Sequence, residues 1–296
     1  MTAAALCFAC YNSSYGETLT VATDKTYGKP ELVIIRGYSG PQQDPVITPD
    51  GKYLFFDTHN DAGAPPFRMH FAKRIDYKTF QYLGPLESTA STGEQQIEGV
   101  EDSNHNFYFI SSDTKGTTIE RGKFTGQTVT NIEPVRGITP VSPPFGFGNL
   151  AVNMDLYITS DGNTLYFTDA VFNPVTGPHS ARASMAKKNP DGSFTRLPNS
   201  DAIVKNVNAL GHIVYNAATA DNRTLVFNVA DTGRLYIATR PSTSVPFGAP
   251  LLVAAADNVS QGSLSEPGSI SLDGKYLYFH RVLDKVSSQL YVLTRQ

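Results

Sequence analysis

The stretch Asp50-Gly51-Lys52-Tyr53-Leu54-Phe55-Phe56 decides the fold of this chain. Its Asp-Gly pair tolerates the positive φ angles that a two-residue hairpin turn requires. The aromatic and branched residues after the pair favour a half-buried strand, and Pro45–Ile47 before it suit a second strand. We therefore predict a strand, a tight turn and another strand for residues 45–56.

The same unit occurs five times along the chain. Its turns are anchored by Asp50, Asn104, Asp161, Asp221 and Asp273, at steps of 54, 57, 60 and 52 residues. Each step has the length of one four-stranded propeller blade with its loops. The residues outside these steps are enough for one more blade but not for two. Counting therefore favours five blades, and a six-bladed ring with one truncated blade is the alternative.

The predicted fold class is thus all-β: a single β-propeller of five blades, each with four antiparallel strands. No linker or shift in composition divides residues 1–296, so we expect a single domain. The N-terminal strand near Leu32–Ile35 is expected to pair with the C-terminal blade, because that closure would remove an exposed sheet edge.

Composition excludes several classes of protein. Hydrophobic residues make up 40% of the 296, enough for a continuous core, and the net charge is −3. The longest basic run is Lys187-Lys188, so we expect no nucleic-acid binding. No apolar stretch is long enough to span a membrane. Cys7 and Cys10 stand three apart, so on a strand their thiols would point to opposite faces, and we interpret both as apolar residues.

The location of the protein is indicated only by composition. The start Met1–Leu6 lacks the basic region of an export signal, so no signal peptide is expected in this chain. Few lysines and many Asn, Thr, Ser and Gly residues favour a periplasmic or secreted protein. We expect a monomer.

The repeat resembles the WD40-like unit of TolB-type propellers, whose pattern is Ser-Pro-Asp-Gly-Lys followed by an apolar strand. Thr48-Pro-Asp-Gly-Lys52 and Ser271-Leu-Asp-Gly-Lys275 match it best, and the resemblance covers nearly the whole chain. The resemblance implies the propeller fold. It leaves function open, because such propellers include partner-binding scaffolds, peptidase-associated gates and enzymes.

A set of acidic residues stands six positions before the turns, which is about 20 Å along a strand at ~3.3 Å per residue. The position is Asp44, Glu98, Asp155, Tyr215 and Pro267 in the five units, and Glu266 adjoins the last. We expect these acids to converge at one mouth of the central channel. Two interpretations stay open: a ring that faces a ligand or metal, or structural caps that bond backbone amides of the next blade.

Other polar residues are expected on the same face, among them Asp57 and His280, which end second strands. His59, His212, Tyr215 and Arg281 are candidate ligand-binding residues, and Arg281 could pair with Glu266. Clustered carboxylates would suit Ca²⁺, which prefers oxygen ligands, so Ca²⁺ is the candidate ion. The metal ligands themselves cannot be assigned from the sequence.

Two functions fit this pattern. The first is a binding module that receives a small polar ligand or a protein segment at the channel mouth. The second is a carbohydrate-active enzyme with Asp44, Asp155 and Glu266 as catalytic residues, since Gln43-Asp44-Pro45, Asp155 and Ser265-Glu266-Pro267 resemble the carboxylate motifs of arabinanase-type propellers. Those enzymes use consecutive blades, whereas these three residues fall on the first, third and fifth, with Glu98 as the spare acid. The chain also contains no Trp to stack against a sugar.

Overall fold

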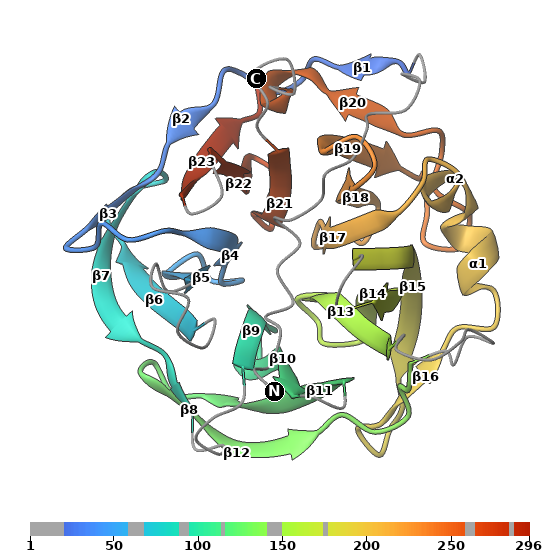
Figure 1. The fold of residues 1–296 in the computed structure, drawn as a ribbon, viewed down its shortest axis with the longest axis horizontal. Helices are drawn as coiled ribbons and strands as arrows, with labels where there is room; N and C mark the ends of the chain where they lie inside the picture. The colour runs from blue at the N-terminus through green and yellow to red at the C-terminus, as the bar shows by residue number, and fades with distance from the viewer. Residues whose placement is uncertain are drawn as a thin grey trace.

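The computed structural model describes residues 21–58, 68–88, 95–113, 116–140, 150–173, 177–257, 264–283 and 287–296. These residues form five small sheets arranged as blades around a common centre (Figure 1). The prediction of an all-β, five-bladed propeller is confirmed, and the six-bladed alternative is wrong.

The blades follow one another along the chain. Blade 1 contains β4 (Gln43–Ile47), β5 (Tyr53–Thr58), β6 (Arg68–Arg74) and β7 (Thr79–Pro85). Blade 2 contains β9 (Gln95–Glu101), β10 (Asn106–Asp113), β11 (Gly116–Phe124) and β12 (Thr128–Pro134). Blade 3 contains β13 (Leu150–Ile158), β14 (Thr164–Asn173), β15 (Gly177–Lys188) and β16 (Phe194–Arg196).

The last two blades complete the ring. Blade 4 contains β17 (Ile213–Ala218), β18 (Thr224–Val229), β19 (Arg234–Thr239) and β20 (Leu251–Val253). Blade 5 contains β21 (Leu264–Ile270), β22 (Tyr276–Val282) and β23 (Ser288–Thr294). The helical segments of the described residues are short: α1 (Ser200–Ile203), α2 (Lys205–Asn208) and η2 (Ala254–Ala256). None of them is long and apolar enough to cross a membrane.

The N-terminal segment runs along the outside of three blades. β1 (Thr23–Asp24) pairs in parallel with β20 of blade 4, and β2 (Glu31–Leu32) pairs antiparallel with β23 of blade 5. β3 (Ile34–Arg36) then pairs in parallel with β7 of blade 1. The strand that we placed at Leu32–Ile35 is therefore divided between the last blade and the first. A further parallel edge strand, β8 (Glu87–Ser88), lies beside β12.

The predicted turns occupy one end of each first strand. The residue after each anchor has a positive φ: Gly51 (70°), His105 (61°), Gly162 (70°), Asn222 (56°) and Gly274 (69°). Glycine, asparagine and histidine tolerate this left-handed region better than most residues do. The Asp-Gly pattern in the sequence therefore reports the backbone geometry of the hairpin.

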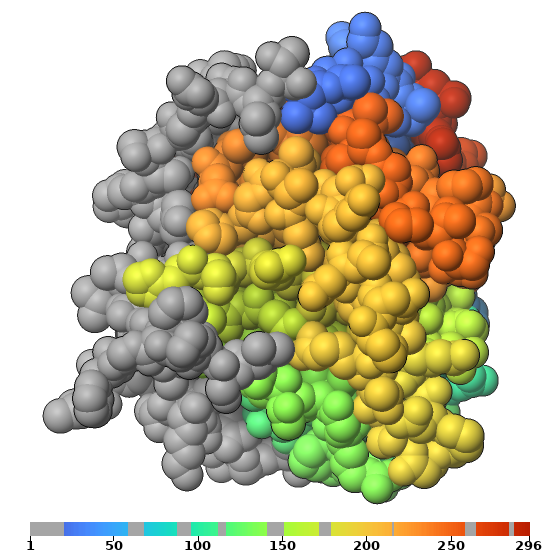
Figure 2. Space-filling view, turned by 90° about the vertical axis from the view of Figure 1, so that its right-hand side faces the viewer, coloured from blue at the N-terminus to red at the C-terminus, as the bar shows by residue number. Residues whose placement is uncertain are grey.

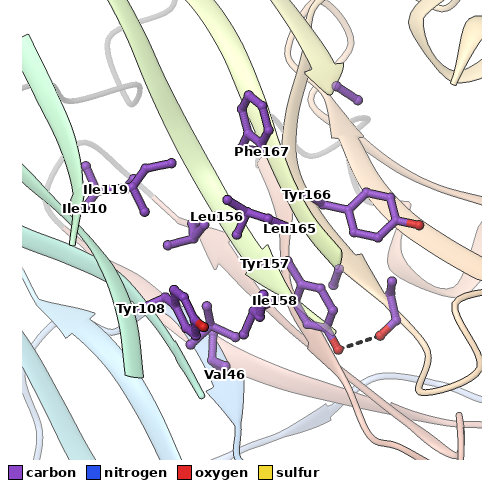
Figure 3. Close-up of a cluster of buried hydrophobic side chains, with 14 of the residues drawn as sticks. Val46, Tyr108, Ile110, Ile119, Leu156, Tyr157, Ile158, Leu165, Tyr166 and Phe167 are labelled. Carbon is purple, nitrogen blue, oxygen red and sulfur yellow. Dashed lines mark hydrogen bonds between the residues drawn. The ribbon is translucent and has the colours of Figure 1, made fainter. Parts of the chain in front are cut away.

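Apolar side chains fill the space between neighbouring blades. Figure 3 shows part of this core, where Tyr108, Leu156, Ile158, Leu165 and Phe167 lie together and are almost wholly buried. At its edge the Tyr157 hydroxyl donates a hydrogen bond to the carbonyl oxygen of Ala218, 2.6 Å away, which connects blade 3 to blade 4. Because buried apolar clusters lie between neighbouring blades all around the ring, the first strands are held at fixed positions around the channel.

Candidate functional site at the channel mouth

Every first strand has a β-bulge at the same height. The register with the second strand shifts between Gln43 and Val46, Ile97 and Val100, Met154 and Tyr157, Val214 and Asn216, and Pro267 and Ser269. In the first three blades the bulge contains an acid with positive φ: Asp44 (49°), Glu98 (59°) and Asp155 (54°). A bulge redirects the side chain that it contains.

The three acids line one small cavity. Asp44, Glu98 and Asp155 border it with Asn216 and Gly268, and the acids are only 9%, 7% and 2% exposed. The cavity volume is ≈ 20 Å³. That volume admits about one water-sized group. The structure thus brings together acids of three consecutive blades, as their shared offset from the turns predicts.

Glu98 connects blades 1, 2 and 3 through hydrogen bonds. The Asp57 carboxylate accepts the backbone N–H of Glu98 at 2.7 Å. Glu98 Oε2 in turn accepts the N–H groups of Asp155 (2.5 Å) and Leu156 (3.3 Å). These bonds match the capping interpretation of Glu98, in which an acid bonds backbone amides of the next blade.

His280 performs the equivalent task between blades 5 and 1. Its side chain is fully buried, and Nδ1 accepts the backbone N–H of Asp44 at 3.2 Å. Its Nε2 lies 2.8 Å from Glu266 Oε2. The two blades approach closely here, since a Cβ on Gly268 would stand 2.1 Å from the carbonyl oxygen of Pro45. Glu266 is therefore bonded to a neighbouring side chain and is not in the lining of the cavity described above.

Asn216 supplies an uncharged acceptor to the cavity. The residue is 4% exposed, and its Nδ2 donates to Thr168 Oγ1 at 3.2 Å. Its Oδ1 accepts no hydrogen bond from the described residues. A buried acceptor beside the cavity favours a hydrogen-bond donor as the occupant.

Burial changes the ionisation of the cluster. It raises the pKa of Asp44 and of Glu98 well above the usual range; His280 opposes the shift at Asp44, and neighbouring carboxylates add to it at both residues. Burial also raises the pKa of Asp57 to about 8, although the N–H of Glu98 opposes it. Like charges in a low-dielectric site cannot all ionise. At neutral pH the cluster is therefore protonated in part.

The remaining candidate residues lie away from the acid-lined cavity or outside the part of the chain that the structure describes. The His212 ring contacts Asp231 and the carbonyl of His179, in a groove separate from the acids. Arg281 stacks over Phe279 and Tyr291 and donates to the carbonyl of Ala256, while Glu266 pairs with His280. Tyr215 is at the bulge of β17, but its side chain is not described, and His59 is outside the described residues. Within the described part of the chain, no three His, Cys, Asp or Glu side chains form a group able to hold a metal ion.

Sequence reasoning placed Asp57 and His280 on this face without giving either a role, and it left out Asn216. The signal for the first two is positional, because the seventh residue after every anchor is polar and buried at the end of an apolar strand. The five are Asp57, Ser111, Thr168, Asn228 and His280, exposed by 2%, 6%, 0%, 1% and 0%. Asn216 has no comparable pattern.

Comparisons with known proteins support the architecture. No protein-family model and no curated protein matches the sequence. A family 117 glycoside hydrolase from Zobellia galactanivorans is similar in structure, with a TM-score of 0.56 at 11% identity over 91% of this chain and 90% of that one. A hypothetical protein from Leishmania major gives 0.48 at 12% identity over 92% and 91%. TolB from Acinetobacter baumannii gives 0.44 at 11% identity over 87% of this chain. The chain spans about half of that TolB, 55% of its length. At such identities the likeness shows the fold alone.

Proposed function

We propose that this protein is a binding module without catalytic activity at its channel. It receives a positively charged or hydrogen-bond-donating group at the channel mouth, presented by a small polar ligand or by a protein segment. The observation that carries this proposal is the cavity of ≈ 20 Å³ bordered by Asp44, Glu98, Asp155 and Asn216. All four side chains carry acceptor oxygens, and the space suits one water-sized group.

The same geometry argues against the enzyme alternative. Hydrolysis of a glycosidic bond needs two carboxyl groups on either side of a sugar ring. The cavity is far smaller than a sugar, Glu98 is engaged with backbone amides, and Glu266 is engaged with His280. Although no three acidic or histidine side chains of the described residues are grouped to hold an ion, Ca²⁺ is tested beside the ammonium probe because the sequence predicts it. A periplasmic or secreted location remains part of the proposal.

Calorimetric titration tests the binding proposal. The probes are Ca²⁺ and Nα-acetyl-lysine methylamide. The backbone ends of this lysine derivative are blocked, so its side-chain ammonium is its single charged group. We expect at least one probe to bind. Asp44→Asn should weaken it about tenfold, because a bound cation would favour the ionised Asp44 carboxylate that the variant removes. Asp201→Asn, an exposed aspartate on α1, is the matched control and should leave the affinity unchanged.

Two outcomes would contradict the proposal. The first is the absence of binding by both probes. The second is turnover of chromogenic aryl glycosides that Asp44→Asn abolishes while the melting temperature stays the same, which would establish catalysis by the acids.

A further inference from the structure

The connection between blades 3 and 4 departs from the repeat. β16 pairs only with Ala186, Lys187 and Lys188, although β15 is twelve residues long. The chain then forms α1 and α2 at the outer rim before it enters β17 (Figure 1). Much of the outer edge of β15 is therefore not covered by a strand. In repeat folds, such departures commonly form binding surfaces.

The helical segment is fixed against the exposed part of β15. Asn208 Oδ1 accepts the N–H of Ala183 at 2.9 Å, and Asn208 Nδ2 donates to the Ala183 carbonyl at 3.1 Å. Ser200 Oγ accepts the N–H of Met185 at 2.9 Å. These side chains take the place of the missing strand pairing, so the wall that they form is held in one position.

A groove lies between β15, α2 and the residues before β17. Its volume is ≈ 400 Å³, and Ser180, Ala181, Arg182, Lys205, Asn208, Ala209, Gly211 and His212 line it. Figure 2 looks onto the rim of the ring where these elements lie. The volume is within the range of small-molecule sites.

Among the described residues, the titratable side chains that line this groove are Arg182, Lys205 and His212, and of these only His212 has an acidic partner, Asp231. Arg182 and Lys205 are exposed, and neither has an ion pair among the described residues. Asp169 is the register partner of Arg182, but Arg196 binds both of its carboxylate oxygens. No acidic side chain of the described residues lines the groove.

His212 lies at the edge of the groove beside its acidic partner, Asp231. Its Nδ1 lies 2.8 Å from Asp231 Oδ1, and its Nε2 lies 3.2 Å from the carbonyl oxygen of His179. Both ring nitrogens thus face acceptors, which only the imidazolium satisfies with two donated protons. The hydrogen bond to Asp231 raises the pKa of His212 accordingly.

We propose that this groove binds a small organic anion with a carboxylate or phosphate group, held by Arg182 and Lys205. The planar guanidinium of Arg182 can donate two parallel hydrogen bonds to either group, and Lys205 adds a point charge. His212, held by Asp231, forms one edge of the site. This site goes beyond the proposed function, because it is separate from the channel and selects the opposite charge.

Titration calorimetry at low ionic strength tests the site with two probes, succinate and inorganic phosphate. We expect at least one to bind, and the tighter of the two identifies the anionic group. Arg182→Gln and Lys205→Gln should each weaken that probe about tenfold. Lys187→Gln removes an exposed lysine of the same strand outside the groove, so it should change the affinity by less than about twofold.

The absence of binding by both probes at about 10 mM would overturn the proposal, because any binding free energy would then be smaller in magnitude than ~3 kcal/mol. An equal loss of affinity in Lys187→Gln and Arg182→Gln would also overturn it, because the attraction would then be nonspecific. Both groove variants replace exposed side chains, so their melting temperatures should match the wild type. Asp44→Asn should not alter anion binding, which keeps this test independent of the channel.

Discussion

The first strands of the blades have carboxyl groups at both ends, and the pKa of these groups shifts in opposite directions at the two ends. At the turn end, the Thr219 and Ser271 hydroxyls donate to Asp221 and Asp273, and these bonds hold the pKa of each carboxyl below its usual range. At the mouth end, burial raises the pKa of Asp44 and Glu98 well above it. The difference comes mainly from exposure, because burial penalises the ionised form of the carboxyl groups at the mouth.

This contrast assigns different tasks to the two ends. The turn aspartates are anions that stabilise a local hairpin. The carboxyl groups at the mouth connect one blade to the next, and they present acceptor oxygens to a cavity that admits about one water-sized group. The shared offset in the repeat therefore fixes the position of a residue, whereas its surroundings fix its ionisation.

The largest effect is expected from truncation of Glu98. Glu98→Ala leaves the buried N–H groups of Asp155 and Leu156 without their acceptor and opens a cavity. We expect a loss of about 2–4 kcal/mol in the free energy of unfolding. Asp273→Ala at the turn end removes only exposed hydrogen bonds and should cost about 0.5–1.5 kcal/mol. Urea denaturation measures both, and equal losses would contradict the contrast.

The dependence of stability on pH should show which end dominates. A carboxyl with a raised pKa binds its proton more tightly in the folded state than in the unfolded state. Its contribution to the free energy of unfolding is therefore greatest at low pH and decreases as the pH rises. Asp57, with a pKa of about 8, should therefore lower the free energy of unfolding between about pH 4 and pH 8. The limiting slope is about 1.4 kcal/mol per pH unit for each extra bound proton.

The turn aspartates give the opposite dependence. Their lowered pKa values stabilise the folded state above about pH 4, and this contribution is lost as the pH falls further. Maximum stability is therefore expected in mildly acid solution. Chemical denaturation across this range is the measurement, and stability that rises steadily towards about pH 8 would contradict a protonated cluster.

The repeat made the fold predictable, because Asp-Gly-like turns indicate hairpins, and the regular steps between them have the length of a propeller blade. The convergence of Asp44, Glu98 and Asp155 was predictable too, since a constant offset from the turn means a constant height along the channel. The hydrogen bonds of the cluster were not predictable. His280 and Asp44 are 236 positions apart, and their contact depends on how blade 5 meets blade 1.

The N-terminal segment shows a similar limit. Short strands such as Glu31–Leu32 and Ile34–Arg36 have no pattern that selects one blade over another. Their pairing follows from the path around the rim after the ring has formed. His212 was assigned to the channel by its place before β17, but the α1–α2 connection directs it into the groove beside Lys205.

A smaller effect is expected when aspartate is replaced by asparagine at each end. Asp57→Asn retains an acceptor for the N–H of Glu98 and removes an unfavourable charge, so its stability should match the wild type at about pH 5 and exceed it at about pH 9. Asp273→Asn should be less stable at neutral pH, because it weakens the hydrogen bonds from Ser271 and Lys275. Thermal melts at the two pH values compare them, and a loss in Asp57→Asn at high pH would show that its charge is favourable.

The most direct test is a titration of the aspartate carboxyl carbons by NMR, with Asp57→Asn and Asp273→Asn used to assign the two signals. We predict that the Asp57 carboxyl titrates near 8, because burial raises its pKa to about that value, and that the Asp273 carboxyl titrates below the usual range of about 4. The channel mouth would then be a partly protonated cluster. If both carboxyl groups titrated together near 4, the mouth would carry ionised acids, and the account of a buried, proton-sharing cluster would be wrong.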